Sequence, residues 1–321
     1  FSCVGDGIQE CRNTWEHKKW NITDFTEFEL AITIDRPELY YDFLQKDWTR
    51  FCHDYWKNNF LEHHTLSKKR VTRIYIGNQF CHNLFPKKKL LFQVLEKALE
   101  NNLAVTLAFS YIRNHLLEEI DELLQELEVW CQSREKEAGK DQEEIIVNDW
   151  AMPILLQGKP HLKPVLGVLL NKRRKDVRLP YKHGIGNHVD SLAENNLNCG
   201  FYQDYLKNTF DIQRFEFESC GYKVTIPDGH HSLHLPFFQT NTSQYCTLYA
   251  VCRYGDREKQ KLPENCPKYC EQKVFLYPKH LKMVGRYNSL FGYDEKILWD
   301  EKQLQDYLEQ GIDRIVVNVS L

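Results

Sequence analysis

The sequence predicts an α/β protein with a TIM-barrel-like (β/α) fold, in which a parallel sheet closes on itself. Short β-branched runs alternate with amphipathic helical patterns along the chain, as in repeated strand–helix units joined by right-handed crossovers. No GxGxxG motif follows a predicted strand, which disfavours an open dinucleotide-binding sheet. The last strand pattern, DRIVVNV, has the β-branched character of a buried strand that closes a barrel.

Each expected element follows from a local pattern. Strands are predicted where β-branched residues gather, and helices where apolar residues recur every three to four positions. Pro37 and Pro86 lie where a first helical turn tolerates proline, and Gly311 follows the last helical pattern as a C-cap would. The predicted strands cover residues 28–34, 71–76, 104–109, 145–147, 165–170, 214–217 and 314–319, and the predicted helices cover 37–44, 87–101, 112–135 and 301–310.

We expect a single domain over residues 1–321, because no repeat or low-complexity linker divides the chain. The segment 222–277 breaks the strand–helix alternation and holds several cysteines. It is therefore predicted to be a Cys-rich β insertion at the barrel mouth. Residues directly after strands line the functional face of (β/α) barrels, and here they are Gly77, Asn78, Cys81, Ser110, Asn148, Asp149, Trp150, Asn171 and Lys172.

The composition is that of an ordinary globular protein. The chain has 321 residues, of which 42% are hydrophobic and 27% charged, with a formal net charge of -3. Such a chain can bury a sizeable core, and its net charge gives no reason to expect binding to nucleic acid or to an anionic membrane. No apolar run reaches the roughly 18 residues that span a bilayer, and no signal-peptide core begins the chain. We expect a cytoplasmic protein without membrane contact, and an RNA partner stays open.

Four cysteines gather in one short segment, CTLYAVCRYGDREKQKLPENCPKYC, at Cys246, Cys252, Cys266 and Cys270. Thiols at this density, with Gly and Pro supplying turns between them, can converge on one metal centre. Disulfides and buried free thiols are the alternatives. However, the total of 11 cysteines is odd and shows no regular disulfide framework. The segment therefore predicts an iron–sulfur or zinc site.

The spacing of these cysteines favours iron–sulfur over zinc. A structural zinc ribbon usually offers two Cys-x-x-Cys knuckles, and this chain has none. Wide and uneven spacing of thiolates suits a cubane cluster, because its ligand positions are spread over a larger volume. The Cys-x-x-x-Cys-x-x-Cys run of radical-SAM enzymes is missing too, since Cys270 is followed by Glu271, Gln272 and Lys273. A [4Fe–4S] cluster is thus the expected cofactor.

Four segments stand out beside the late cysteines: YIGNQFCHNLFP (75–86), LAVTLAFSYIR (103–113), IIVNDWAMPILL (145–156) and KPVLGVLLNKRRKD (163–176). Together with those cysteines they resemble the U32 peptidase family, in particular the iron–sulfur branch that includes the proteins of oxygen-independent ubiquinone hydroxylation. This resemblance implies that one early and three late cysteines bind a [4Fe–4S] cluster. Cys81 matches the early ligand, and Cys266 and Cys270 match the final pair. For the remaining ligand, Cys252 fits the spacing more closely than Cys246, and both stay open.

The resemblance also implies a function. Relatives hydroxylate an aromatic or a nucleobase without molecular oxygen, drawing the oxygen from a hydroxylated metabolite such as prephenate. We therefore expect an iron–sulfur oxidoreductase that modifies an aromatic, nucleobase or peptide-like substrate, with a prephenate-like donor. The alternatives are a non-catalytic iron–sulfur partner subunit of a U32 complex and a U32-type peptidase. No HExxH or GxSxG motif supports a peptidase.

A basic run follows one predicted strand. The run from Lys172 to Lys175, which includes Arg173 and Arg174 and is continued by Arg178, lies where a barrel would present it to its mouth. Guanidinium groups bind carboxylates and phosphates bidentately, so the run is a candidate site for an anionic group of the substrate. The alternative is a solvated loop, since charge runs commonly face water.

His82 and Asp149 are the catalytic candidates. His82 follows Cys81 and can donate a hydrogen bond to a cluster sulfur or move a proton, or it is an ordinary loop histidine. Asp149 can act as a general base, or it caps a helix that begins near residue 151. The adjacent pairs His63–His64 and His230–His231 are expected to be solvated loop residues more often than metal ligands.

Overall fold

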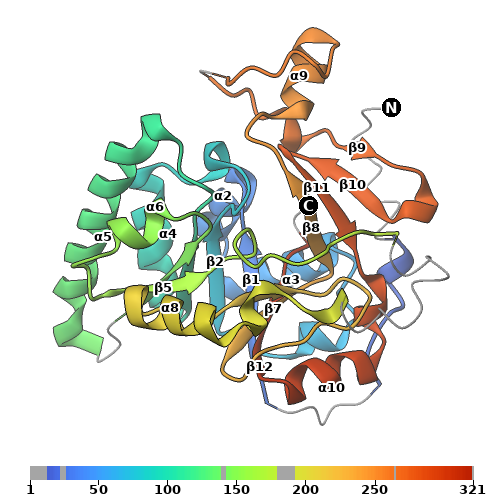
Figure 1. Cartoon of the computed structure of the whole chain (residues 1–321), viewed down its shortest axis with the longest axis horizontal. Helices are drawn as coiled ribbons and strands as arrows, with labels where there is room; N and C mark the ends of the chain where they lie inside the picture. Colours follow the sequence, from blue (N-terminus) through green and yellow to red (C-terminus); the bar gives the residue numbers. More distant parts are fainter. Residues whose placement is uncertain (1–12, 22–26, 139–141, 179–191, 264, 320–321) are drawn as a thin grey trace.

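A nearly closed parallel barrel forms the centre of the molecule (Figure 1). The computed structural model describes residues 13–21, 27–138, 142–178, 192–263 and 265–319. Eight strands pair in the order β5-β4-β3-β2-β1-β12-β7-β6. The two ends of this order meet where Leu166 and Phe215 form a parallel bridge and the Leu166 N–H donates to the carbonyl of Arg214 at 3.0 Å. The predicted TIM-barrel-like fold is confirmed.

The barrel strands follow one another around the barrel in chain order, and neighbours pair in parallel. Each is short and buried, as expected of strands covered on both faces. The strands are β1 (Glu29–Ile34), β2 (Arg73–Gly77), β3 (Ala104–Ala108), β4 (Glu143–Val147), β5 (Leu162–Leu166), β6 (Glu216–Glu218), β7 (His231–Leu235) and β12 (Ile312–Val317).

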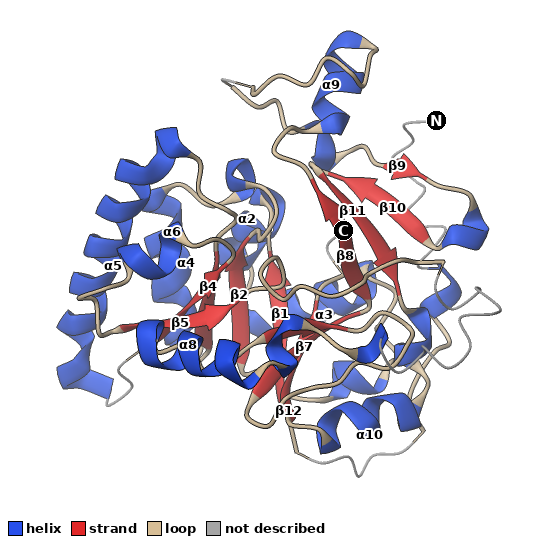
Figure 2. Cartoon of the chain, viewed as in Figure 1, coloured by secondary structure: helices blue, strands red, loops and turns tan. Residues whose placement is uncertain are grey.

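Helices return the chain between most strands and cover the outside of the barrel (Figure 2). They are α2 (Pro37–Gln45), α3 (Trp48–Asn58), α4 (Lys88–Glu100), α5 (Leu117–Ala138), α6 (Ala151–Leu155), α8 (Gly200–Phe210) and α10 (Glu301–Glu309). Short 3₁₀ turns are η1 (Asn13–Trp15), η2 (Thr65–Lys68), η3 (His82–Leu84), η4 (Asn114–Leu116), η7 (Asn196–Asn198), η8 (Tyr269–Glu271), η9 (Lys279–Leu281) and η10 (Glu295–Leu298). In the part of the chain that the structure describes, no helix is long and apolar enough to cross a membrane.

A second, antiparallel sheet is inserted between β7 and β12. Its order is β8-β11-β10-β9, and its strands are β8 (Phe237–Thr242), β9 (Phe275–Leu276), β10 (Met283–Arg286) and β11 (Ser289–Tyr293). The helix α9 (Thr247–Tyr254) lies beyond one end of this sheet, at the top of Figure 1. We call residues 237–293 the insertion. The insertion follows β7 and therefore begins at the carboxyl ends of the barrel strands.

The insertion has other limits than the predicted segment 222–277. That segment contains β7, which pairs with β6 and β12 as a barrel strand. The sequence of β7, HSLHL, was not predicted as a strand because polar residues interrupt its apolar pattern. A second difference is β5, predicted at 165–170 but observed at Leu162–Leu166 with Pro164 inside it. Because β5 borders the barrel seam, a residue without an N–H is tolerated there.

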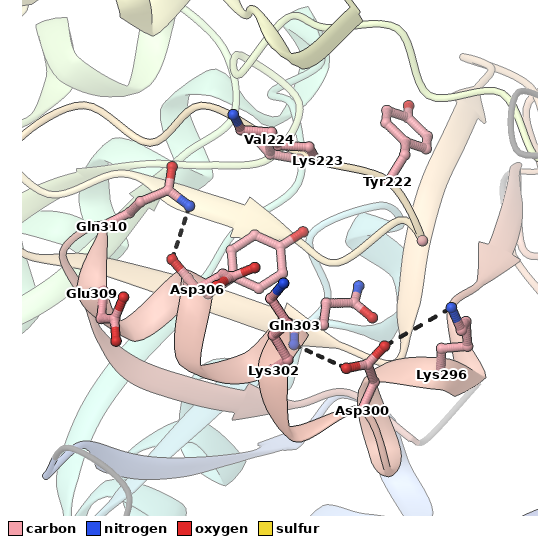
Figure 3. A pocket seen from close by; sticks show the side chains of 12 residues that line it. Tyr222, Lys223, Val224, Lys296, Asp300, Lys302, Gln303, Asp306, Glu309 and Gln310 are labelled. Carbon is pink, nitrogen blue, oxygen red and sulfur yellow. Dashed lines mark hydrogen bonds and ion pairs between the residues drawn. The ribbon is translucent and has the colours of Figure 1, made fainter. Parts of the chain in front are cut away.

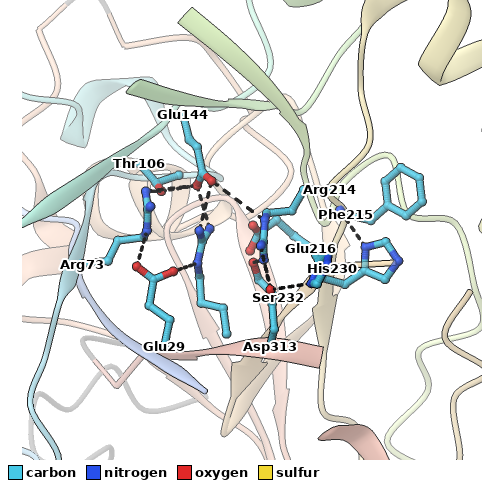
Figure 4. Close-up of polar contacts among 12 residues, drawn as sticks. Glu29, Arg73, Thr106, Glu144, Arg214, Phe215, Glu216, His230, Ser232 and Asp313 are labelled. Carbon is cyan, nitrogen blue, oxygen red and sulfur yellow. Dashed lines mark hydrogen bonds and ion pairs between the residues drawn. The ribbon is translucent and has the colours of Figure 1, made fainter. Parts of the chain in front are cut away.

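The barrel interior holds a network of buried charges near the amino-terminal ends of the strands (Figure 4). Arg314 donates to Glu29 at 2.6 Å and to both oxygens of Glu144 at 2.6 and 3.0 Å. Arg73 donates to Glu29 at 2.9 Å, and Thr106 donates to Glu144 at 2.7 Å. Burial alone would raise the pKa of Glu144, but Arg73 and Arg314 outweigh it and lower that pKa to about 2. Side chains from opposite strands thus hold the barrel together by paired charges.

Candidate metal centre

Cys81 is positioned by the loop that follows β2. Gly77 ends this strand with φ of +108°, and a Cβ there would meet the carbonyl oxygen of Ala108 at 2.6 Å, so only glycine fits. The Asn78 side-chain oxygen then accepts hydrogen bonds from the N–H groups of Phe80 and Cys81, both at 2.9 Å. This turn places Cys81 at the carboxyl end of the barrel, the functional face of such folds.

Cys246 comes from the insertion and caps the helix α9. Its Sγ accepts from the N–H of Tyr249 at 3.3 Å and donates to the carbonyl of Tyr287 at 3.0 Å. Tyr287 lies in the turn between β10 and β11. The thiol is therefore tied to both the helical and the sheet part of the insertion.

Cys270 lies in η8, four residues after Cys266. The side chain of Cys270 is buried and that of Cys266 is half-buried. The carbonyl of Cys270 accepts from Nε of the buried Arg286 at 2.8 Å. Lys268, between the two cysteines, adopts a left-handed conformation with φ of 53°. The chain thus turns sharply between the two thiols.

These four cysteines interact electrostatically. Burial raises the pKa of Cys81 to about 11, and Cys266 contributes to the rise. Burial likewise raises the pKa of Cys246 to about 12, with contributions from Cys81 and Cys266. The pKa of Cys270 is raised by burial first, and then by Cys81, Cys246 and Cys266. Such mutual effects require proximity, so thiols that lie up to 189 positions apart in the sequence gather at one place. We call Cys81, Cys246, Cys266 and Cys270 the thiol set.

Two arginines oppose the rise in the pKa values of these thiols. Arg286 lowers the pKa of Cys270, and Arg113 lowers that of Cys81, although burial dominates both. Arg113 lies in the loop after β3 and donates to the carbonyl of Gln244 in the insertion. Positive charge beside the thiols favours their ionised, ligand-competent form. The same arginine also ties the barrel to the insertion.

Cys252, the fifth predicted ligand, lies six residues beyond Cys246 in α9. Six residues of α-helix advance about 9 Å along the axis and turn to another face. The electrostatic contacts described above join Cys246 to the other three thiols, whereas sequence spacing favoured Cys252. Among the described residues, no group of three or more His, Cys, Asp or Glu side chains is arranged to hold a single metal ion.

The predicted anion site is not assembled. Lys172 and Arg174 have exposed side chains, and Arg178 forms an exposed ion pair with Asp176 at 2.7 Å. Arg173 lies on the opposite side of this extended segment and points into the protein. Because neighbouring residues of an extended chain face opposite ways, the run cannot act as one clamp.

Arg173 makes internal contacts instead. One of its nitrogens donates to Sγ of the buried Cys220 at 3.1 Å, and another donates to the carbonyl of Glu218. Both partners belong to the end of β6 and the loop after it. Arg173 therefore joins the loops after β5 and β6, and its role is structural.

Asp149 caps α6. One of its carboxylate oxygens accepts from the N–H groups of Ala151 and Met152, each at 3.0 Å, and the other accepts from the N–H of Ile112. Both oxygens are thus bound to backbone amides that the fold needs to satisfy. Of the two interpretations of Asp149, the structure supports the helix cap over the general base.

His82 lies beside the thiol set, directly after Cys81. Burial first, and then Arg113, lower the pKa of His82 to about 4, so the ring is neutral at pH 7. It lines a groove of about 930 Å³ with Phe85 and Phe109, whose rings stack at 4.3 Å. The groove places these aromatic rings among charged side chains, including Lys88 and Glu126.

The paired histidines are not solvated loop residues throughout. His64 is buried, its Nδ1 accepts from the N–H of Leu66 at 3.1 Å, and its Nε2 donates to the carbonyl of Leu298 at 2.8 Å. His231 is also buried, and burial lowers the pKa of each ring to about 4. The expectation of solvation was wrong for these two, while the preceding histidine of each pair is exposed.

Sequence reasoning missed a small polar pocket at the centre of the barrel mouth. Its volume is about 40 Å³, and its lining includes Asp35, Glu218 and His234. Of the residues predicted on the functional face, Gly77 and Asn78 line it. The sequence did contain an indication of this pocket, namely charged residues and histidines within otherwise apolar strand patterns. Buried residues of these types indicate a functional site more often than exposed charges do.

A larger hollow, of about 740 Å³, lies between α10 and the loop 221–224 (Figure 3). Lysines and carboxylates alternate around it, and Lys296 lies 3.8 Å from Asp300. None of the predicted site residues lines it. Its charges are balanced locally, so it offers no preference for an anion or a cation.

Together, the fold and the gathered cysteines define a TIM-barrel-like protein whose inserted sheet brings three thiols to a fourth at the barrel mouth. Comparisons with protein-family models, with curated proteins and with solved structures give no match. The similarity to the U32 family therefore rests on the residues quoted above and stays a prediction.

Proposed function

We propose that this protein binds a [4Fe–4S] cluster through Cys81, Cys246, Cys266 and Cys270. The observation that carries the proposal is the mutual electrostatic effect of these four thiols. One comes from the barrel and three from the insertion, the one-plus-three division that the resemblance implies. A cluster requires four thiolates at positions more widely spaced than those around one ion. Cys252 is then left outside the ligand set.

The surroundings of the thiol set fit a cluster. Its donors are all thiols, the ligand type that iron–sulfur clusters use. Arg113 and Arg286 supply positive charge where thiolates and sulfide would place negative charge. Iron would deprotonate the buried thiols outright, as metals do with coordinating thiols. Thiolate ligation also agrees with the reducing compartment of a cytoplasmic protein, which we include in the proposal.

We further propose that the cluster serves an enzyme. The thiol set lies at the carboxyl end of the barrel, where (β/α) barrels carry their active sites. The adjoining groove offers Phe85 and Phe109 to an aromatic substrate, and lysines and glutamates line it too. The reaction class is oxygen-independent hydroxylation, or a related modification, of an aromatic, nucleobase or peptide-like substrate. That class, together with a prephenate-like donor, rests on the resemblance to the U32 branch.

A second candidate is a non-catalytic iron–sulfur subunit that binds a U32-family partner. An exposed aromatic surface on α6 and α8 favours it. The side chain of Phe201 is 82% exposed, and Trp150 lies 6.4 Å from Tyr205 and 6.1 Å from Phe210, measured between ring centroids. Exposed apolar clusters of this kind often mark protein interfaces. Formation of a hydroxylated aromatic product by the purified chain under argon, detected by mass spectrometry, would support the enzyme over the subunit.

The test of the cluster is a comparison of single cysteine variants after anaerobic reconstitution. The wild type should hold about four iron and four sulfide per chain, as a cubane requires. Cys266→Ser and Cys246→Ser should lose most of the iron and the brown absorbance. Cys252→Ser and the distant, buried Cys131→Ser are matched controls that should keep both. Full iron content in Cys266→Ser would refute the site, and loss in Cys252→Ser with retention in Cys246→Ser would refute this ligand set.

A further inference from the structure

The polar pocket at the barrel mouth adjoins the thiol set. Its lining comes from β1, β2, β3, β6 and β7 and from residues just after β5 and β12, so most of the barrel converges on it. Phe80, on one side of the pocket, precedes Cys81 in the loop after β2. The ring of Phe80 lies 4.8 Å from that of Phe291 in the insertion. The insertion thus packs against one wall of the pocket, and one loop serves both the pocket and the thiols.

A line of buried polar groups leads to His234 in this pocket. Glu216, which is fully buried in β6, bonds to Nε2 of His234 through one carboxylate oxygen. Its other oxygen accepts from the Tyr75 hydroxyl at 3.0 Å, and that hydroxyl accepts from Arg314 at 3.2 Å. A carboxylate in this position fixes the tautomer and orientation of a histidine, as in catalytic triads. With the proton on Nε2, the Nδ1 atom of His234 carries the free electron pair.

Asp35 gives the pocket its preference for hydrogen-bond donors. Its Oδ1 is buried and has no hydrogen-bond partner among the described residues. A buried acceptor without a donor is costly unless a ligand or water supplies one. An anionic ligand would be repelled by the same carboxylate. The pocket therefore suits a group that donates hydrogen bonds, such as a hydroxyl or an ammonium.

The second carboxylate of the mouth does not change this preference. Glu218 forms an ion pair with the buried Lys175, and its other oxygen accepts from the N–H of Gln239 at 2.7 Å. Lys175 also donates to the carbonyl of Val168 at 3.2 Å. The pair is neutral as a whole and its groups bind one another. Asp35 and His234 are consequently the acidic and basic side chains of the lining that keep an atom for a ligand, beside neutral polar groups such as Thr33 and Gln79.

We propose that this pocket is a proton-transfer site, in which Asp35 accepts a hydrogen bond from a hydroxyl or ammonium group of the substrate and His234 takes its proton. The O–H or N–H bond of the substrate breaks, its electron pair stays on the substrate, and a new bond forms between the proton and Nδ1 of His234. Glu216 is a positioning residue that stabilises the resulting imidazolium. The catalytic part of this inference rests on the proposed function, whereas the binding part does not require iron.

The binding part can be tested on iron-free protein by nuclear magnetic resonance with ¹⁵N-labelled histidine. The His234 signals are assigned with a His234→Gln variant. Methylammonium, ethylene glycol and acetate serve as probes of cation, hydroxyl and anion. Methylammonium or ethylene glycol should shift the His234 signals saturably, and acetate should not. Asp35→Asn should weaken methylammonium binding by about tenfold, as loss of a charge-assisted hydrogen bond predicts, whereas the exposed control Asp176→Asn should leave it unchanged.

The role of Glu216 has its own signature. In the wild type, the ¹⁵N shifts should report a proton on Nε2, and Glu216→Gln should shift the position of that proton towards Nδ1. Preference for acetate, no shift with any probe, or undiminished methylammonium binding in Asp35→Asn would overturn the proposal. Because the samples contain no iron, failure of the cluster proposal and failure of this one are separate results.

Discussion

Replacement of Arg314 by Met tests whether paired charges hold the barrel closed. Arg314 is buried in β12, and its guanidinium binds Glu29 and Glu144 from strands on either side of the interior. Methionine fills similar space without charge, so Arg314→Met leaves both carboxylates without their main donor. Removing one partner of a buried ion pair typically costs about 3–5 kcal/mol. We expect a loss of this size in the free energy of unfolding at pH 7.

The pKa of Glu144 gives a second, independent value for the stabilisation by these paired charges. Its folded-state pKa of about 2 lies below the ordinary 4.5, a difference that corresponds to about 3 kcal/mol of stability. This contribution is present above pH 4.5 and is lost as the pH falls towards 2. In Arg314→Met, burial is less opposed, so Glu144 takes up a proton at a higher pH than in the wild type. The destabilisation should therefore be largest at pH 7 and smaller at pH 4.

The assay is urea denaturation followed by circular dichroism at both pH values. Arg178→Met is the matched control, since its exposed ion pair with Asp176 should contribute little. Equal destabilisation by the two substitutions would refute the reasoning. A cost of Arg314→Met that is the same at pH 4 as at pH 7 would show that the loss is one of packing and not of charge.

Two further predictions concern the fold around the sites. The folded-state pKa of His64 is about 4, below the ordinary 6.5. As the pH falls, the unfolded chain therefore binds a proton at His64 before the folded chain does. Through this group the free energy of unfolding should decrease by about 2 kcal/mol between pH 7 and pH 5. Urea denaturation should show a weaker pH dependence in His64→Gln and an unchanged one in the exposed control His63→Gln. Gly77→Ala should lower the free energy of unfolding by about 1–3 kcal/mol. The positive φ of residue 77 is strained for alanine, and the added Cβ atom would collide with the carbonyl oxygen of Ala108. Gly200→Ala, with open space around it, should have little effect in the same assay.

The barrel was predictable because its strands are buried on both faces. Such burial selects β-branched runs, and these are visible in β1, β2 and β12 without knowledge of their neighbours. In β7 the same rule fails, since His234 is stabilised by Glu216, which lies 18 positions earlier. A single sequence does not show that pairing. Polar strands inside a barrel are therefore hidden from pattern reasoning.

The thiols illustrate a second limit of prediction from the sequence. The sequence shows that cysteines are close along the chain, but the ligand set depends on which of them face one another. The preference for Cys252 followed its spacing to Cys266, and the sequence did not show that α9 turns Cys246 and Cys252 to different faces. Similarly, the basic run was treated as one cluster, although alternation along the extended chain buries Arg173 and exposes Arg174. Local conformation decides which side chains form a site.

The loop after β2 connects the two proposed sites. Gly77 allows the chain to turn against β3, Asn78 fixes the turn and lines the pocket, and Cys81 reaches the thiol set. A substrate held by Asp35 and His234 would therefore lie a few residues of chain from any cluster bound at Cys81. Because both sites depend on one rigid turn, the proton-transfer group and the cluster would be held in fixed relation to each other. That fixed relation is what an enzyme needs if proton removal and cluster chemistry are to act on the same molecule.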